Sequence, residues 1–279
     1  MGIREGSGIS GQGPGRRSAI DPAADFTTSE LMVAAGAREL RDGEVAVVGL
    51  GIPLVAAALA QRTHAPGLKA LNELGVIDPR PLELGVGNAD ARLWYQASLY
   101  GSFIDVMGTM LHRGLVDVGF IGALEVDMYG NSNTTEVLRP DGSVHRINGS
   151  GGANDMASSA KRTIIILRHE RRKLTDRLSH LTSPGFLRGG RTREEAGLRG
   201  GGPWRVLTDK AVLGFDDQTR RMKLLSIHPG VSHQELRDST GFPLDVPADC
   251  PITPAPTEEQ VRLIREELDP QRLFTGGGV

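Results

Sequence analysis

The sequence predicts an α/β fold in which an open, mostly parallel sheet is flanked by helices and carries an antiparallel hairpin late in the chain. Two observations lead to this prediction. Apolar runs of strand length alternate with helical patterns between residues 28 and 270, and parallel strands require such crossovers. In addition, the run RTIIILRHE (162–170) places three consecutive isoleucines between charged ends, which is typical of a strand.

The chain is predicted to consist of a tail and one domain. Residues 1–27 are rich in Gly, Ser and Arg and lack apolar periodicity, so they predict a disordered tail. The Arg16-Arg17 pair of this tail is not followed by the apolar stretch that an export signal needs. Residues 28–279 are predicted to form a single α/β domain.

The domain is expected to open with a helix, a strand and a second helix. A Thr or Ser cap near Thr28 begins the first helix, which is expected to stop at Asp42-Gly43. The apolar run 45–60 is too short for a membrane span, and two glycines and a proline interrupt it. It therefore predicts a strand (45–48), a glycine turn and a helix (53–62).

Later segments repeat this alternation. The patterns predict a strand followed by a turn at Gly75 within 68–77, a helix at 97–114, and a buried strand with its exit loop at 116–127. They also predict a hairpin of 204–216 and 221–230 and a closing helix at 258–270. The segment 185–204 is rich in glycine and charge, so we expect it to be an exposed loop.

Composition excludes several classes of function. Lys and Arg number 32 against 34 Asp and Glu, so the chain lacks the basic excess of a nucleic-acid-binding protein. The single cysteine, Cys250, cannot form an internal disulfide, and no Cys/His cluster offers a metal site. We therefore expect a cytoplasmic protein without metal and without a membrane or nucleic-acid partner. The 37 glycines gather in clusters, as they do where backbone approaches a ligand.

Four glycine-containing segments are candidates for chemistry, and the fourth, Thr182-Ser183-Pro184-Gly185, by itself predicts only a turn. Gly49 and Gly51 lie in a turn between strand and helix, but no third glycine completes a dinucleotide fingerprint. Glu73 follows a predicted strand, and ligands of open α/β sheets bind at the carboxyl ends of strands. The loop 149–155 is suited to binding an oxyanion or phosphate through its amides. Taken alone, the first segment is better explained as an ordinary turn and Glu73 as a solvated glutamate, whereas the loop 149–155 is equally well explained as a flexible connector.

Taken together and in order, these segments resemble the β subunit of glutaconate CoA-transferase, a class I coenzyme A transferase. The resemblance extends from about Ser29 to Phe274. It is carried by VGLGIP (48–53), ELGVIDPRPLE (73–83), IGALEVDMYGNSNTT (121–135), GSGGANDMA (149–157), TIIILRHERRKL (163–174), LTSPGF (181–186), VLTDKAVLGFDDQTRRM (206–222), TGFPLDV (240–246) and LIREELDP (263–270).

The resemblance implies the fold of the CoA-transferases (NagB/RpiA-like) and assigns roles to single residues. Glu73 matches the catalytic glutamate, and Gly152 matches the glycine whose N–H helps to form the oxyanion hole. Gly49 and Gly51 match a first glycine loop that lines the cleft. Gly151 and Ala153 match a second loop, which also contacts the thioester end of CoA. The polar neighbour that glutaconate transferase has after its glutamate is replaced by Leu74, so the acyl specificity of that enzyme is not implied.

The resemblance further implies ping-pong transfer of CoA between an acyl-CoA and a free carboxylic acid, through a glutamyl-CoA thioester on Glu73. The CoA thioester is then a substrate, and no tightly bound cofactor is expected. An α subunit is implied as an obligate partner, in an α₂β₂ or larger assembly. Two alternatives stay open: a ring-cleaving acyl-CoA hydrolase subunit with Glu73 as general base, and a non-catalytic CoA-binding subunit.

Other polar and aromatic residues give weaker signals. His112, His169 and His228 are expected to have structural or surface roles. Trp94 and Tyr95 are expected to pack in the core, with the lining of an acyl pocket as the alternative. The basic run Arg168, Arg171, Arg172 and Lys173 is expected to be a solvated face, with binding of a CoA phosphate as the alternative.

Overall fold

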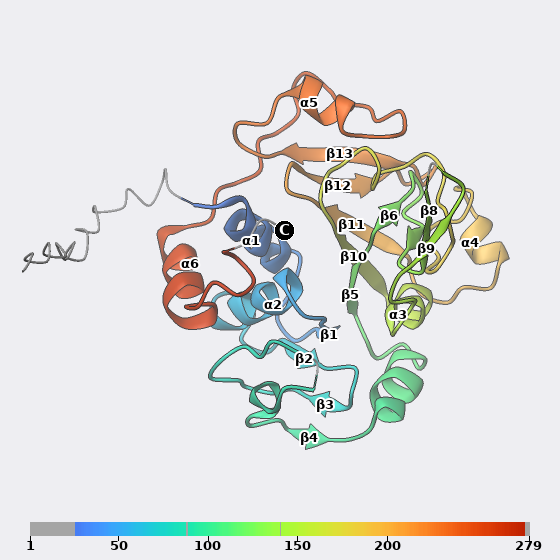
Figure 1. Cartoon of the computed structure of the whole chain (residues 1–279). Helices are drawn as coiled ribbons and strands as arrows, with labels where there is room; N and C mark the ends of the chain where they lie inside the picture. Colours follow the sequence, from blue (N-terminus) through green and yellow to red (C-terminus); the bar gives the residue numbers. More distant parts are fainter. Residues whose placement is uncertain (1–25, 88, 140, 277–279) are drawn as a thin grey trace, which may run out of the picture.

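The computed structural model describes residues 26–87, 89–139 and 141–276 (Figure 1). The tail predicted at 1–27 therefore lies outside the described residues, except for Phe26 and Thr27. Thr27 is the N-cap of the first helix and forms a capping box with Glu30. In the part of the chain that is described, no helix is long and apolar enough to cross a membrane.

The helices are α1 (Thr28–Arg38), α2 (Ile52–Arg62), α3 (Ala153–Ser159), α4 (Thr192–Glu195), α5 (His233–Asp238) and α6 (Glu258–Leu263). A 3-10 helix, η1 (Ala91–Trp94), and two π-helices, η2 (Ile104–Leu111) and η3 (Ile264–Leu268), accompany them. The strands are β1 (Val45–Val47), β2 (Lys69–Leu71), β3 (Val76–Ile77), β4 (Leu99–Tyr100), β5 (Val118–Gly122), β6 (Glu125–Val126), β7 (Ser132–Asn133), β8 (Glu136–Leu138), β9 (Val144–Arg146), β10 (Arg162–Ile166), β11 (Pro203–Leu207), β12 (Ala211–Phe215) and β13 (Met222–Ile227).

Nine strands form one sheet in the order β13-β12-β11-β10-β5-β1-β2-β3-β4. The five central strands, from β11 to β2, are parallel, and an antiparallel pair continues the sheet at each end. The predicted open, mostly parallel sheet is therefore confirmed. The chain leaves β1 toward β2 on one side and later returns to place β5 on the other side of β1. The crevice between β1 and β5 is thus a topological switch point.

Helices cover both faces of the sheet. Alternate residues of the central strands, such as Ile164 and Ile165, enter two different apolar clusters. The first cluster joins the sheet to α1, α2 and the C-terminal residues 263–268, and the second joins it to η2 and α3. Strands buried on both faces read as continuous apolar runs, which explains why 162–166 was recognisable from sequence.

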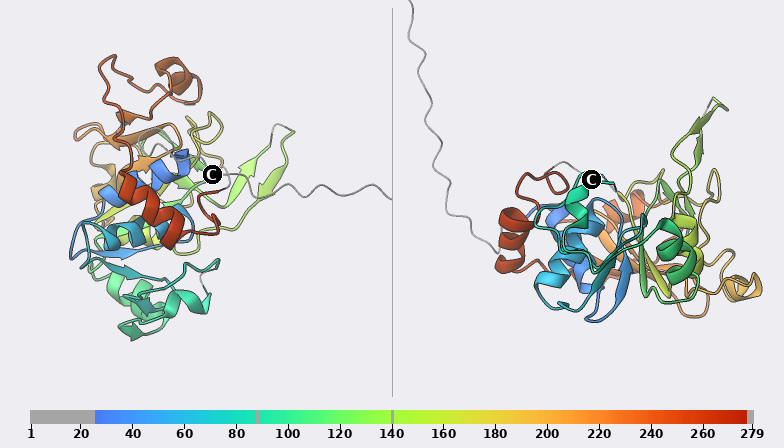
Figure 2. Two further views of the ribbon diagram at one scale, coloured as in Figure 1. Left: turned by 90° about the vertical axis from the view of Figure 1, so that its left-hand side faces the viewer. Right: turned by 90° about the horizontal axis from the view of Figure 1, so that it is seen from below.

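A two-stranded ribbon, β8–β9, projects from the body of the molecule (Figure 2). The ribbon begins just after β7, and its second strand ends just before Ile147, next to the glycine-rich segment 149–153. Leu138 and Val144, which pair across the ribbon, are both exposed.

Three predictions of secondary structure were wrong. The helix predicted at 97–114 is a short strand, β4, followed by the π-helix η2, and Gly101-Ser102 separates the two. In 68–77 the predicted turn at Gly75 is present, but the strand before it ends at Leu71 and a second strand, β3, follows the turn. The first hairpin arm, 204–216, is likewise two strands, since a turn at 208–210 divides β11 from β12.

The exposed loop predicted at 185–204 was also wrong, because part of it is core. Phe186 is buried, and so is Arg193, whose side chain is 4% exposed. The Arg193 guanidinium donates hydrogen bonds to the backbone carbonyls of Ala157, Ser158, Pro184, Gly185 and Gly200. A buried cation of this kind replaces its hydration shell with carbonyl dipoles, and the charge that marked the segment as exposed is what anchors it.

Candidate active site

A cleft of about 870 Å³ lies at the carboxyl ends of β1, β2 and β5, where the switch point of the sheet places a ligand site. Its walls come from four segments of the chain and one side chain that projects between them. The segments are 49–53 after β1, 120–124 at the end of β5, 147–153 before α3, and the C-terminal pair Leu273 and Phe274. The projecting side chain is that of Glu73.

The first glycine turn connects β1 to α2. Gly51 is the N-cap of α2 and has φ +88° and ψ −144°, a conformation that only glycine adopts readily. No side chain caps this end of the helix, and Pro53 occupies its first turn without needing a hydrogen-bond acceptor. Gly49 has open space where a side chain would project. The turn therefore presents bare backbone to the cleft.

Glu73 stands in a tight turn between β2 and β3. The Leu74 N–H donates to Asn72 Oδ1 at 2.8 Å, and the Gly75 N–H donates to the Asn72 carbonyl at 3.0 Å. Gly75 has φ +106°, and a methyl group there would lie 2.6 Å from the backbone carbonyl of Gly101. This close packing of two backbones fixes the turn, and it explains why a glycine follows the glutamate.

The second glycine loop faces Glu73 from the other side of the cleft. Gly149 and Gly151 both have positive φ, and Gly152 is the N-cap of α3, again without a side-chain cap. A methyl group on Gly152 would lie 2.8 Å from Glu73 Oε2 and 2.7 Å from Met107 Cε. The Glu73 carboxylate thus lies directly against the Gly152 backbone, with room for a hydrogen but not for a carbon.

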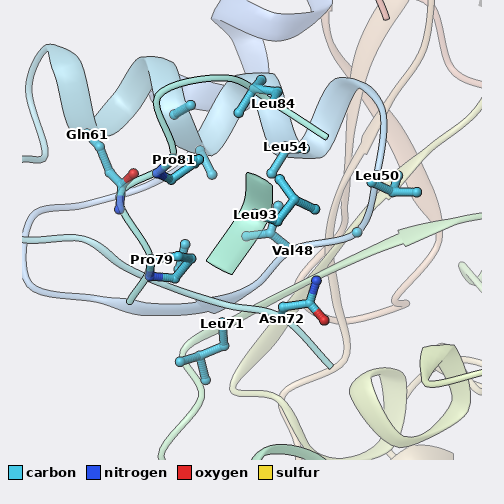
Figure 3. A pocket seen from close by; sticks show the side chains of 14 residues that line it. Val48, Leu50, Leu54, Gln61, Leu71, Asn72, Pro79, Pro81, Leu84 and Leu93 are labelled. Atoms are coloured by element: carbon cyan, nitrogen blue, oxygen red, sulfur yellow. The ribbon is translucent and has the colours of Figure 1, made fainter. Parts of the chain in front are cut away.

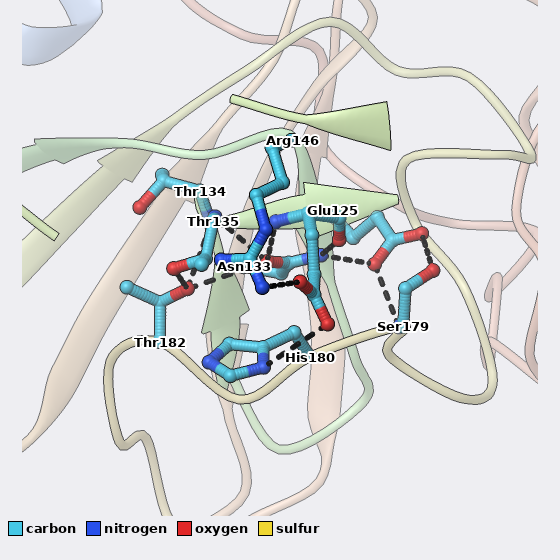
Figure 4. Close-up of polar contacts among 9 residues, drawn as sticks. Glu125, Asn133, Thr134, Thr135, Arg146, Ser179, His180 and Thr182 are labelled. Carbon is cyan, nitrogen blue, oxygen red and sulfur yellow. Dashed lines mark hydrogen bonds and ion pairs between the residues drawn. The ribbon is translucent and has the colours of Figure 1, made fainter. Parts of the chain in front are cut away.

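A polar network holds this loop from behind (Figure 4). Thr134 Oγ1 donates to the Gly149 carbonyl at 2.8 Å, and the Gly149 N–H donates to the Thr134 carbonyl at 3.0 Å. The Thr134 N–H in turn donates to Thr182 Oγ1, and the Asn154 side chain donates to the Thr182 carbonyl at 2.6 Å. Thr182 therefore ties both ends of the loop to one point.

The same network continues into buried polar side chains. Asn133 donates to Glu125 Oε2 at 2.7 Å and accepts from the Thr135 N–H and from Thr182 Oγ1. The backbone and hydroxyl of Ser179 both donate to Glu125. Thr182 was predicted only as part of a turn, and the other residues of this network had no predicted role, although IGALEVDMYGNSNTT and LTSPGF were among the segments that carried the resemblance. The sequence feature that could have identified these residues is the density of Asn, Thr and Ser in short segments flanked by apolar residues.

A second, smaller pocket adjoins the cleft and shares Gly49 and Leu50 with it (Figure 3). It is apolar except for Gln61 and Asn72, and its volume is about 40 Å³.

The six site residues predicted from the sequence all line the one cleft: Gly49, Gly51, Glu73, Gly151, Gly152 and Ala153. Trp94 and Tyr95 do not. The core packing predicted for them was wrong, because they are 37% and 45% exposed and line a different groove, together with Leu82 and Tyr100.

The histidines lie outside the cleft. His169 and His228 are buried and hydrogen-bonded to hydroxyl or carbonyl oxygens of neighbouring residues, and His112 is exposed. Burial lowers the pKa of His169 to about 4, so this imidazole is neutral at physiological pH. These surroundings indicate structural roles for His169 and His228.

Comparison with known proteins agrees with the fold. The family model for coenzyme A transferase matches residues 29–239, and the chain belongs to this family. Over 258 residues it is 36% identical to the B subunit of glutaconate CoA-transferase from Acidaminococcus fermentans, an alignment that covers 90% of this chain and 95% of that one. It is 35% identical to the B subunit of 3-oxoadipate CoA-transferase from Pseudomonas knackmussii, covering 86% and 92% of the two chains.

The solved structure of glutaconate CoA-transferase from Acidaminococcus fermentans superposes with a TM-score of 0.85 at 33% identity, covering 92% of this chain and all of that one. More distant relatives carry other activities in their names. One is the cholesterol ring-cleaving hydrolase IpdB subunit of Rhodococcus jostii, 25% identical over 80% of this chain and 83% of its own. Another is the decarboxylase AibA/AibB, with 27% identity and a TM-score of 0.77, which covers 91% of this chain and all of that one.

Proposed function

We propose that this chain is the β subunit of a heteromeric enzyme that moves CoA from an acyl-CoA to a free carboxylic acid, with Glu73 as the nucleophile. The observation that carries the proposal is the contact of the Glu73 carboxylate with the Gly152 backbone inside a cleft walled by two glycine loops. The family membership and the named relatives support the reaction class. The single cysteine accords with a reducing, cytoplasmic setting.

The first half-reaction uses only groups that a carboxylate and an acyl-CoA supply. The Glu73 carboxylate attacks the thioester carbonyl, the C–S bond breaks, and CoA leaves as the thiolate from a mixed anhydride. The thiolate then attacks the glutamyl carbonyl of this anhydride. The donor acid departs as its carboxylate, and CoA stays on Glu73 as a thioester. An acceptor carboxylate reverses both steps, so no net proton transfer and no general base are required.

The glycine loops supply hydrogen-bond donors, which the Glu73 carboxylate lacks. Each attack forms a tetrahedral oxyanion, and we assign the Gly152 N–H as one donor to it. Gly49 and Gly51 are assigned to the wall on the α2 side, and Gly151 and Ala153 to the contact with the thioester end of CoA. Glycine at these positions lets backbone amides approach the reacting carbon more closely than a residue with a side chain would allow.

The cleft is open on one side, and the named relatives are subunits of heteromeric enzymes. We propose that an α subunit closes the cleft, that the chain alone is inactive, and that the assembly is α₂β₂ or larger.

The decisive experiment traps the thioester. The assembled enzyme is incubated with an acyl-CoA and then treated with borohydride, which reduces a glutamyl thioester to an alcohol that peptide mass spectrometry locates. Modification of Glu73, lost in Glu73→Gln, is the expected result. Release of free CoA with no adduct would instead support a hydrolase in which Glu73 activates water. Activity that survives Glu73→Ala would show that this chain has no catalytic role.

A further inference from the structure

Exposed apolar side chains gather on one short part of the chain. Within the described residues, sixteen large apolar side chains are exposed, and nine of them lie between residues 74 and 104. We call these nine the β4 surface: Leu74, Leu82, Val86, Trp94, Tyr95, Leu99, Tyr100, Phe103 and Ile104. Single exposed apolar residues are normal, but a concentration of this kind marks a surface that another molecule covers.

The centre of the β4 surface is a shaped groove. Leu82, Trp94, Tyr95 and Tyr100 line a hollow of about 630 Å³. The Tyr100 hydroxyl donates to the Trp94 carbonyl at 2.7 Å, which joins the two sides of the groove. Polar side chains of Glu83, Arg92 and Gln96 complete the lining. Aromatic anchors beside polar groups, with an arginine among them, are the composition of protein–protein interfaces.

The groove borders an open edge of the sheet. β4 is the last strand of the nine and, among the described residues, pairs only with β3. Unpaired edge strands promote association, and proteins usually protect them with Lys, Pro or a covering segment. β4 consists of Leu99 and Tyr100, whose side chains point to opposite faces, so apolar groups flank this edge on both sides.

The opposite edge of the sheet shows the contrast. At β13, Ile227 forms a bridge with Ile252, and its N–H and carbonyl are hydrogen-bonded to the covering segment. The chain therefore covers the end of the β13 edge by itself, whereas no described segment pairs with β4 on its outer side.

The β4 surface is continuous with the turn that carries Glu73. The Gly101 N–H donates to the Gly75 carbonyl at 2.9 Å, so the segment between Tyr100 and Phe103 supports this turn directly. Leu74, the next residue after Glu73, belongs to the surface. A molecule seated here would therefore lie beside the open cleft.

The area is sufficient for a stable subunit contact. Aromatic side chains bury about 150–250 Å² each when fully covered, so the four aromatic and five aliphatic side chains, which flank both faces of the β4 edge and are about half exposed, together offer on the order of 1,000 Å². A standard interface takes about 800 Å² from each partner, whereas the largest patch on a monomer is about 300–600 Å².

We propose that the β4 surface is where the α subunit docks, and that Trp94, Tyr95 and Tyr100 are its aromatic anchors. This inference rests on the proposed function for the identity of the partner. It adds the location of the contact, and it explains why the two aromatics expected in the core are exposed in this chain.

The test measures assembly and does not depend on activity. This chain and the α-type CoA-transferase chain encoded by the same genome are purified separately and mixed, and their dissociation constant is measured by light scattering and calorimetry. Tyr100→Glu and Ile104→Glu, at side chains 61% and 70% exposed, should each weaken binding about a hundredfold or more. Ile252→Glu is the matched control on the opposite edge, is 58% exposed, and should bind as wild type does.

Fluorescence gives a second readout. In a Trp204→Phe background Trp94 is the one remaining tryptophan, and mixing with the α chain should shift its emission to the blue and protect it from acrylamide. Circular dichroism melting of each variant alone confirms folding.

Three outcomes would overturn the inference: no binding by the wild-type chain, equal binding by all three glutamate variants, or a homodimer of this chain that Ile104→Glu dissociates. Glu73→Gln separates the two proposals, because it should bind the α chain normally and lack transfer. If Glu73→Gln is active while Ile104→Glu fails to assemble, only the catalytic proposal is wrong.

Discussion

Replacing Gly152 by alanine tests the geometry of the cleft at the point where Glu73 meets the second glycine loop. Gly152 has φ −78° and ψ −2°, so alanine is compatible with its backbone. The added methyl group would lie 2.8 Å from Glu73 Oε2 and 2.7 Å from Met107 Cε. Both neighbours must move away, and the Glu73 carboxylate has to retreat from the loop.

The expected magnitudes differ for stability and for catalysis. Both clashing atoms are the ends of flexible side chains, so the free energy of unfolding should fall by only about 1–2 kcal/mol. Restoring a normal contact displaces the carboxylate by roughly 0.5–1 Å, and a misplacement of about 1 Å in a catalytic group costs about a hundredfold in rate. The variant should therefore be folded but nearly inactive.

The assay is the steady-state rate of CoA transfer by the assembled enzyme, with urea denaturation of the chain as the measure of stability. We expect kcat to fall about a hundredfold while KM for the acyl-CoA changes little, because the substrate's remote contacts are untouched. Gly87→Ala is the control, since a methyl group there meets nothing within 4 Å. A Gly152→Ala enzyme with the wild-type kcat would refute the placement of Glu73 against this loop.

Three further changes have predictable results. The Gly75→Ala variant should lose more than about 3 kcal/mol of unfolding free energy or fail to fold, because the added methyl group collides with the Gly101 backbone. Its control is Gly43→Ala, at a glycine that also has positive φ but open space around it, and this variant should lose only about 1–2 kcal/mol in the same urea titration. Arg193→Lys should destabilise by about 3 kcal/mol or more in thermal and urea melts, because an ammonium group cannot serve the same set of carbonyls. Burial lowers the pKa of His169 to about 4 from an ordinary 6.5, so as the pH falls the unfolded chain becomes protonated at this residue before the folded chain does. The free energy of unfolding should therefore fall by up to about 3 kcal/mol between pH 7 and pH 4. The His169→Gln variant should show a weaker dependence on pH.

The sequence predicted the elements whose patterns are local. A three-isoleucine strand, a glycine turn between strand and helix, and a hairpin around 216–219 each follow from neighbouring residues, and all three are present. The cleft was predictable because parallel strands end at one edge, which brings separate glycine segments together.

The failures came from interactions that no local pattern encodes. The segment 185–204 reads as solvated by composition, yet Arg193 is buried among the carbonyls of Gly185 and Gly200 in its own segment and of the distant Ala157. The helix predicted at 97–114 loses its first turn to β4, because Gly101 must lie flat against Gly75. Trp94 and Tyr95 were expected inside because aromatic residues usually are, whereas in the structure they line the exposed groove of the β4 surface.

Two different sets of contacts hold Glu73 in place, and the difference between them gives a physical reason for the chain to need a partner. On one side the carboxylate meets the Gly152 loop, which Thr134, Thr182 and the buried Glu125 network hold from within the chain. On the other side its turn rests on Gly101, next to an edge strand that has apolar groups on both faces and, among the described residues, no strand beyond it. If the α subunit covers this edge, it stabilises the less protected of the two supports. Assembly would then fix the distance between the nucleophile and the oxyanion donor, in addition to closing the cleft.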